Sequence, residues 1–116
     1  MVAPMRKAVL ISVLLAAASP ALAGASGFTL VNGTGAALAQ LSIRRSGTQE
    51  WKALGPAPSA GARMDMKFSN PDCAFDIRAT VAGAGPITWA DVNLCDVKSV
   101  TLNHDASAGA WVDYDH

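Results

Sequence analysis

The sequence predicts a small all-β fold, an antiparallel β-sandwich or barrel with one disulfide, after a cleaved N-terminal signal helix. Three observations lead to this prediction. Apolar and polar residues alternate with a period of two along most of the chain, as in strands that bury one face. Turn residues interrupt this alternation roughly every 8–15 residues. The chain has 116 residues and two cysteines, which suits one domain and one bridge.

The N-terminal segment 1–23 has the features of an export signal. A basic pair precedes an uncharged apolar run over 8–18, and a proline then leads into Ala21-Leu22-Ala23, whose small residues suit a signal peptidase. We expect cleavage after Ala23, with Ala25 as the second choice. The apolar run is shorter than the roughly 20 residues that span a bilayer, so no membrane anchor is expected after cleavage.

The remaining residues, 24–116, are predicted to form one β domain that is periplasmic or secreted. The whole chain is 51% hydrophobic and 16% charged, which excludes a disordered chain. Loss of the two basic residues of the signal leaves a small excess of acidic residues. Only Arg44 and Arg45 form a cationic pair, so the clustered cations that nucleic-acid binding requires are missing from the sequence.

The first half of the domain carries three predicted strands. Residues of one parity form the expected buried faces: Phe28 and Leu30, then Ala39, Leu41 and Ile43, then Met64, Met66 and Phe68. The segment 32–35 (NGTG) can turn tightly between the first two strands. The segment 55–61 (GPAPSAG) is predicted to be a loop, and Asn70-Pro71-Asp72 a turn.

Four strands are predicted in the second half. The clearest is 73–81, where Cys73 shares the apolar face with Phe75 and Ile77, so the bridge is expected to be buried. In the next strand, apolar residues change parity between Trp89 and Val92, and a β-bulge near Ala90-Asp91 would return them to one face. The last two strands are marked by these residues: Val100 and Leu102, then Trp111, Val112 and Tyr114.

The two cysteines are expected to pair. Cys73 and Cys95 are the only cysteines, and an exported chain folds in an oxidising compartment. Neither belongs to a C-x-x-C unit, which argues against a redox or metal role. A bridge of this spacing stabilises a small domain by roughly 3 kcal/mol in the chain-entropy model.

Four motifs follow one another over residues 28–102: F-x-L-V-N-x-T-G from Phe28, a central Trp51, C-x-x-D-I-R from Cys73 and W-x-x-V-N-L-C from Trp89. Together they resemble a family of small exported bacterial β proteins that is uncharacterised and sometimes labelled Tat pathway signal protein. The resemblance implies a secreted β domain with one bridge and carries no activity. The Arg44-Arg45 pair stands where a Ser-Pro-like turn is expected, so a shared loop function does not carry over.

The sequence predicts a protein that is not an enzyme and needs no cofactor. A serine hydrolase holds a histidine between an acid and a nucleophile, but His104 is predicted in a polar loop and His116 is the last residue. A glycosidase needs two carboxylates facing across a cleft. Asp76 is expected instead to pair on the sheet surface with Arg78 or a cross-strand neighbour.

A periplasmic metal-binding protein, with copper as the candidate metal, is the alternative function. Met64 and Met66 place two thioethers on one strand face, which suits Cu(I), and His104 could add a ligand. The competing interpretation is that both methionines belong to the core, because they share their parity with Phe68.

The main functional prediction is an exported binding or interaction module, whose partner is an envelope protein or a small ligand. Loops on a rigid bridged sheet suit recognition, and the segments 44–52 and 55–61 are the expected contact region. Arg44, Arg45 and Trp51 are the leading residues. Trp51 either offers an exposed contact or covers an open end of the sandwich.

Overall fold

The computed structural model describes residues 24–116, and the predicted signal segment lies outside the described residues. In chain order the strands are β1 (Phe28–Asn32), β2 (Leu38–Arg45), β3 (Lys52–Ala53), β4 (Arg63–Met66), β5 (Ala74–Val81), β6 (Gly85–Asn93), β7 (Ser99–Asp105) and β8 (Gly109–Asp115). A search of these residues for a helix long and apolar enough to cross a membrane finds none.

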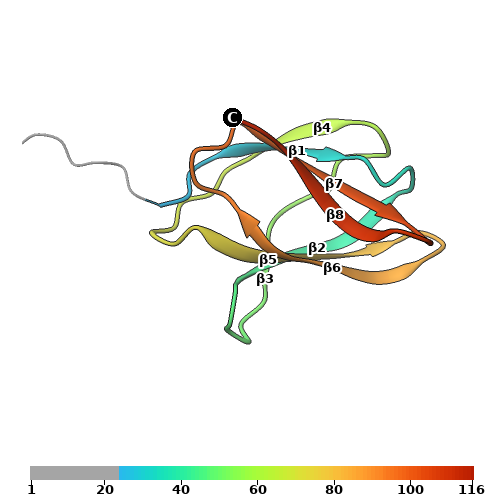
Figure 1. The fold of residues 1–116 in the computed structure, drawn as a ribbon, viewed down its shortest axis with the longest axis horizontal. Coiled ribbons are helices and arrows are strands. Elements are labelled where there is room, and N and C mark those ends of the chain that lie inside the picture. Colours follow the sequence, from blue (N-terminus) through green and yellow to red (C-terminus); the bar gives the residue numbers. More distant parts are fainter. Residues whose placement is uncertain (1–23) are drawn as a thin grey trace, which may run out of the picture.

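The strands form two four-stranded sheets that pack face to face (Figure 1). One sheet has the order β4-β1-β7-β8, and the other has the order β3-β2-β5-β6. Neighbouring strands are antiparallel except β1 and β7, which run parallel. The predicted all-β class is confirmed, with one sheet mixed instead of purely antiparallel.

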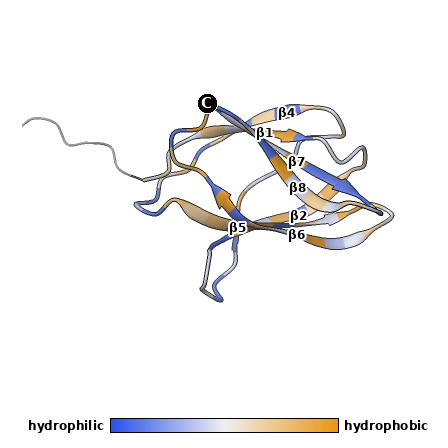
Figure 2. Cartoon of the chain, viewed as in Figure 1, coloured by the Kyte–Doolittle hydropathy of each residue, from blue (hydrophilic) through white to orange (hydrophobic). Residues whose placement is uncertain are grey.

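The hydrophobic core lies between the sheets, and its largest fully buried apolar side chains are Trp89, Phe75, Leu30, Ile77, Leu94, Leu102, Val92 and Val100. Trp89 also joins the two sheets, because its Nε1 donates a hydrogen bond of 2.8 Å to the carbonyl of Asn103 in β7. Phe68 packs edge to face on Phe28 and Phe75, with ring centroids 6.3 and 5.1 Å apart. Figure 2 shows hydrophilic residues on the loop between β2 and β3, which projects from the sandwich.

The connection after β1 carries the chain from one sheet to the other, since β1 and β2 belong to different sheets. The chain bends there as predicted, but the bend does not close a hairpin. The buried Asn32 side chain stabilises this crossover. Its Nδ2 donates to the carbonyls of Ala36 and Pro58, and its Oδ1 accepts from the N–H and the hydroxyl of Thr34.

Two β-bulges decide which residues face the core. The β5–β6 register shifts at Asp91, which has a φ of +54°, and this predicted bulge puts both Trp89 and Val92 in the core. A second bulge at Gln40 (φ +54°) in β2 was not predicted. Because of it, Ala39 is exposed, and the expectation that it shares the buried face of β2 is wrong.

The predicted Cys73–Cys95 disulfide forms, with an S–S distance of 2.03 Å. The prediction that this bridge is buried is wrong. Cys73 is exposed and Cys95 is half-buried. Cys73 directly precedes β5, and Cys95 lies just beyond the end of β6, so the bridge joins the ends of adjacent strands. The parity that buries Phe75 therefore does not extend back to Cys73, which lies beyond the paired strand.

Strand ends differ from the prediction where a partner strand extends or shortens the pairing. His104 lies within β7, opposite Ala110 of β8, and the prediction that it occupies a polar loop is wrong. Phe68 follows β4 in a loop, although it still packs on the core. The two-residue strand β3, directly after Trp51, was not predicted because its pairing depends on β2.

Candidate functional site

Arg44 and Arg45 are adjacent in β2 and therefore point to opposite faces of the sheet. Arg44 lies opposite Asp76 of β5 on the outer face. Arg45 lies opposite the core residue Phe75 and reaches Asp72 with its Nε, 3.3 Å from a carboxylate oxygen. The structure thus separates two residues that the sequence places side by side.

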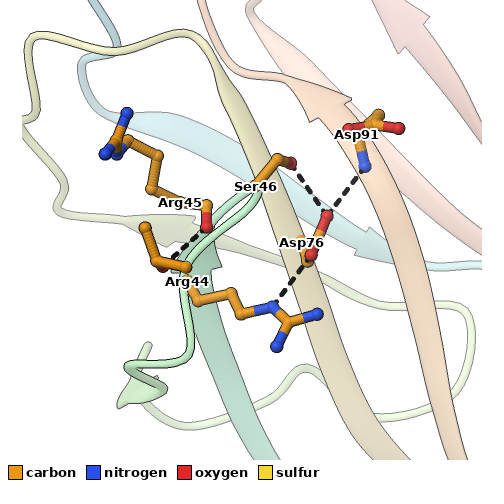
Figure 3. A network of polar contacts seen from close by, with 6 residues as sticks. Arg44, Arg45, Ser46, Asp76 and Asp91 are labelled. Carbon is orange, nitrogen blue, oxygen red and sulfur yellow. Dashed lines mark hydrogen bonds and ion pairs between the residues drawn. The ribbon is translucent and has the colours of Figure 1, made fainter.

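Asp76 is a buried carboxylate at the centre of a polar network (Figure 3). Its Oδ2 accepts a hydrogen bond of 2.9 Å from Nε of Arg44. Its Oδ1 accepts from the Ser46 hydroxyl at 2.8 Å and from the N–H of Asp91 at 3.0 Å. The bulge at Asp91 frees that N–H from the strand ladder, so it can point at the carboxylate. Both carboxylate oxygens are therefore already occupied by groups of the protein.

The protonation state of Asp76 follows from these contacts. Burial by itself raises the pKa of the Asp76 carboxyl, because it disfavours the charged form. The hydrogen bonds from Asp91, Arg44 and Ser46, and the positive charge of Arg44, act in the opposite direction and outweigh burial. The pKa of Asp76 therefore lies below its ordinary value, and the carboxyl is ionised at neutral pH.

Trp51 is half-buried and packs against two guanidinium groups. The Cζ atom of Arg44 is 4.4 Å from the centroid of the indole, and that of Arg78 is 4.0 Å from it. Each cation–π contact contributes roughly 0.5–1 kcal/mol at such a site. We call the group of Arg44, Trp51, Asp76 and Arg78 the Trp51 face. The sequence left open whether Trp51 offers an exposed contact or covers an end of the sandwich, and the structure places it half-buried against these two arginines.

Sequence reasoning did not assign Arg78 or Ser46 to the binding region. A signal for Arg78 was present, because Asp76, Arg78 and Thr80 share the outward parity of one strand. The contact of Arg78 with Trp51 could not be predicted, because the alternation within one strand does not say which distant segment packs on it. Ser46 carried no such signal, since it lies in the turn after β2.

Arg45 lines a different feature, a pocket of about 280 Å³ where the β2–β3 loop meets the β4–β5 loop. Its apolar wall is Ile43, Phe68 and Phe75. Its other charged residues are Arg44, Lys52, Glu50 and Asp72. The Arg45–Asp72 pair is about half exposed on both sides, so it contributes little stability. Two of its three cations, Arg44 and Arg45, are already paired with Asp76 and Asp72.

The candidate metal ligands do not gather in one place. Met66 is buried in the core, and Met64 is half-buried against it. Met64 lies across β1 from Val100, and His104 follows four residues later in β7, roughly 13 Å along the strand. Within 24–116, no group of three or more His, Cys, Asp and Glu residues is placed to hold a metal ion.

No family model, curated protein or solved structure matches the chain. Membership of the exported bacterial family that the motifs resemble therefore stays a prediction. The structure does give the motif residues physical roles. Asn32 stabilises the crossover between the sheets, Asp76 accepts a hydrogen bond from Arg44 within the Trp51 face, and Trp89 joins the two sheets.

Proposed function

We propose that the protein is an exported, non-catalytic binding or interaction module of the cell envelope, with the Trp51 face as its contact surface. It would act in the periplasm or after secretion. Export is supported by the signal features of residues 1–23 and by the Cys73–Cys95 disulfide, which suits an oxidising compartment. Intact mass spectrometry of the protein in a periplasmic extract and in the medium tests this part.

One observation carries the choice of surface: Trp51 is held against two arginines on the outer face of the β3-β2-β5-β6 sheet. Tryptophan and arginine dominate the binding energy of many interfaces, because they offer large contact areas and several donors. Ordering them before binding lowers the entropy cost of association. Here the buried carboxylate of Asp76 orders Arg44, and Arg44 in turn packs on Trp51.

The test compares Trp51→Ala with Trp111→Ala, which removes the same side chain from the exposed face of β8. Both purified variants and the wild-type protein are incubated with isolated peptidoglycan, outer-membrane vesicles and periplasmic extract. We expect the wild-type protein to bind one of these fractions, Trp51→Ala to lose at least about tenfold in affinity, and Trp111→Ala to be unchanged. Equal binding of both variants would overturn the assignment of the surface.

A control for folding is needed, because Trp51 also packs on the sheet. Circular dichroism and thermal unfolding should show that Trp51→Ala keeps the wild-type structure at the temperature of the binding measurement. Arg44→Gln provides a second variant of the same face that leaves the indole in place. A folded Arg44→Gln variant that binds as tightly as the wild-type protein would remove Arg44 from the contact surface.

A further inference from the structure

We propose that the outer face beside Trp51 contains an oxyanion-binding site centred on Arg78, which takes a carboxylate, sulfate or phosphate group carried by a hydroxylated envelope molecule. This inference rests on the proposed function, because it assigns a ligand class to the same face. It is carried by the charge of Arg78, by the amide donor of Gln40 in the same hollow and by the packing of Arg78 on Trp51.

The charge of Arg78 has no acidic partner among residues 24–116. The ion pairs of this part of the chain use Arg44 and Arg45, and Arg78 takes part in neither. The nearest acid on its own strand face is Asp76, but both oxygens of Asp76 already accept hydrogen bonds from other groups. Among residues 24–116, Arg78 is therefore a cation of this sheet that takes part in no ion pair.

Arg78 lines an open hollow of about 460 Å³ together with Gln40, Ser42, Thr80 and Pro86. Gln40, Ser42 and Thr80 carry amide or hydroxyl groups, and the Ser42 hydroxyl donates its hydrogen to the backbone carbonyl of Gln40 at 3.2 Å. The Thr80 hydroxyl donates to Oε1 of Gln40 at 3.3 Å, which leaves the amide nitrogen of Gln40 for another acceptor. The hollow thus combines the Arg78 cation with the amide donor of Gln40, and none of the residues that line it is acidic.

The packing of Arg78 on Trp51 prepares the guanidinium for this role. A guanidinium that stacks with its plane on an aromatic ring keeps its N–H groups free at the edges, where they can bind two oxygens of one anion. Half-burial restricts the side chain before a ligand arrives. A single cation of this kind suits one oxyanion group and is too little charge for a nucleic-acid backbone.

The experiment is a ¹⁵N NMR titration of the oxidised domain with sodium phosphate, sodium sulfate, sodium glucuronate and, as neutral control, glucose. Sodium chloride at matched ionic strength corrects for screening. The Trp51 indole N–H and the Arg78 Nε–H report the site, and the Trp111 indole is the internal reference. We expect saturable shifts of the first two signals with at least one oxyanion, and no saturable shift of the Trp111 signal. Preference for glucuronate over phosphate would identify an acidic glycan as the source, and the reverse would identify a phosphate group.

Arg78→Gln removes the charge, and Arg63→Gln is its matched control, since Arg63 is an exposed arginine of β4 in the other sheet. We expect Arg78→Gln to weaken oxyanion binding about tenfold or more, and Arg63→Gln to leave it unchanged. Arg78→Lys keeps the charge but loses the planar fork, so its affinity should lie between those of the wild-type protein and Arg78→Gln.

Three results would overturn the oxyanion site. These are the absence of any saturable shift, the same shift with glucose, and an unchanged affinity in a folded Arg78→Gln variant. Failure here is distinguishable from failure of the proposed function. If Trp51→Ala abolishes binding to an envelope fraction while no oxyanion titrates, the contact surface remains and its ligand class is wrong.

Discussion

At the scale of single residues, Asp76 shows how a polar side chain can be buried in a strand that otherwise alternates. It is 6% exposed and lies between the buried residues Phe75 and Ile77. A buried carboxylate is costly unless its oxygens are satisfied. Arg44, Ser46 and the backbone of Asp91 satisfy them, so the charge becomes the centre of the Trp51 face.

The first prediction is that Asp76→Asn lowers the free energy of unfolding by about 2 kcal/mol, because the amide keeps the size of the side chain but loses its charge-assisted bonds. Urea unfolding at neutral pH measures the change. Asp65→Asn is the control, since Asp65 is exposed and accepts one bond from Thr29. Its expected loss is at most about 0.5 kcal/mol. Equal losses in the two variants would contradict a special role of Asp76.

The second prediction concerns acid. The pKa of Asp76 is lowered in the folded protein, whereas the same group titrates near 3.9 in an unfolded chain. As the pH falls, Asp76 therefore binds its proton first in the unfolded state. The stabilisation that ionised Asp76 contributes is complete above about pH 5 and is lost as the pH falls to the folded-state pKa. Urea midpoints between about pH 6 and 3 should fall more steeply for the wild-type protein than for Asp76→Asn. Parallel profiles would show that Asp76 does not carry this dependence.

At the scale of elements, Gly24 and Ala25 belong to the folded domain although they precede β1. Ala25 is buried, its N–H donates to the carbonyls of Asn70 and Asp72, and its carbonyl accepts from the N–H of Asn70. Gly24 has a φ of +97°, and an added Cβ would lie 2.3 Å from the carbonyl oxygen of Asn70. The segment therefore holds the β4–β5 loop in place, and only glycine fits at position 24.

The third prediction is that a chain beginning at Ser26 is less stable than one beginning at Gly24 by about 2 kcal/mol, because it loses these hydrogen bonds and the burial of Ala25. Denaturant unfolding of the two purified chains measures the difference. Of the two cleavage positions considered, the one after Ala23 keeps these contacts and the one after Ala25 removes them. Equal stability of the two chains would leave the choice between these positions without a structural basis.

At the scale of the whole molecule, stability depends on contacts that cross the sandwich and on the disulfide. Trp89 ties the sheets together from within, and Tyr114 of β8 accepts a hydrogen bond from the N–H of Asn93 in β6. The bridge restrains the ends of β5 and β6 from outside the core. A domain of this size buries a modest share of its surface, so such restraints matter.

The fourth prediction is that replacing both cysteines by serine lowers the free energy of unfolding by about 3 kcal/mol, since the bridge spans 22 residues. The reduced wild-type protein serves as control, and its urea midpoint should match that of the double variant. The exposure of Cys73 should let a reductant reach the bridge in the folded protein. A double variant as stable as the oxidised protein would contradict this account.

Much of the local structure could be predicted because a strand's alternation is a property of its own residues. The buried faces of β1 and β5, the bulge at Asp91 and the pairing of the cysteines follow from parity and from counting. The bulge at Gln40 could not be predicted, since Leu41 and Ile43 continue the apparent parity of Ala39.

The sequence by itself determined the all-β class, the single bridge and the polar parity that sets Asp76 beside Arg78, because these depend on neighbours in the chain. Only the tertiary structure decided the parallel pairing of β1 with β7 and the crossover at Asn32. It also decided the candidate site. Arg44 pairs with the carboxylate of Asp76, 32 residues away in the sequence, and Trp51 packs on Arg44 of β2 and Arg78 of β5. Such contacts require segments distant in the chain to pack together, and alternation within one strand carries no information about its partner.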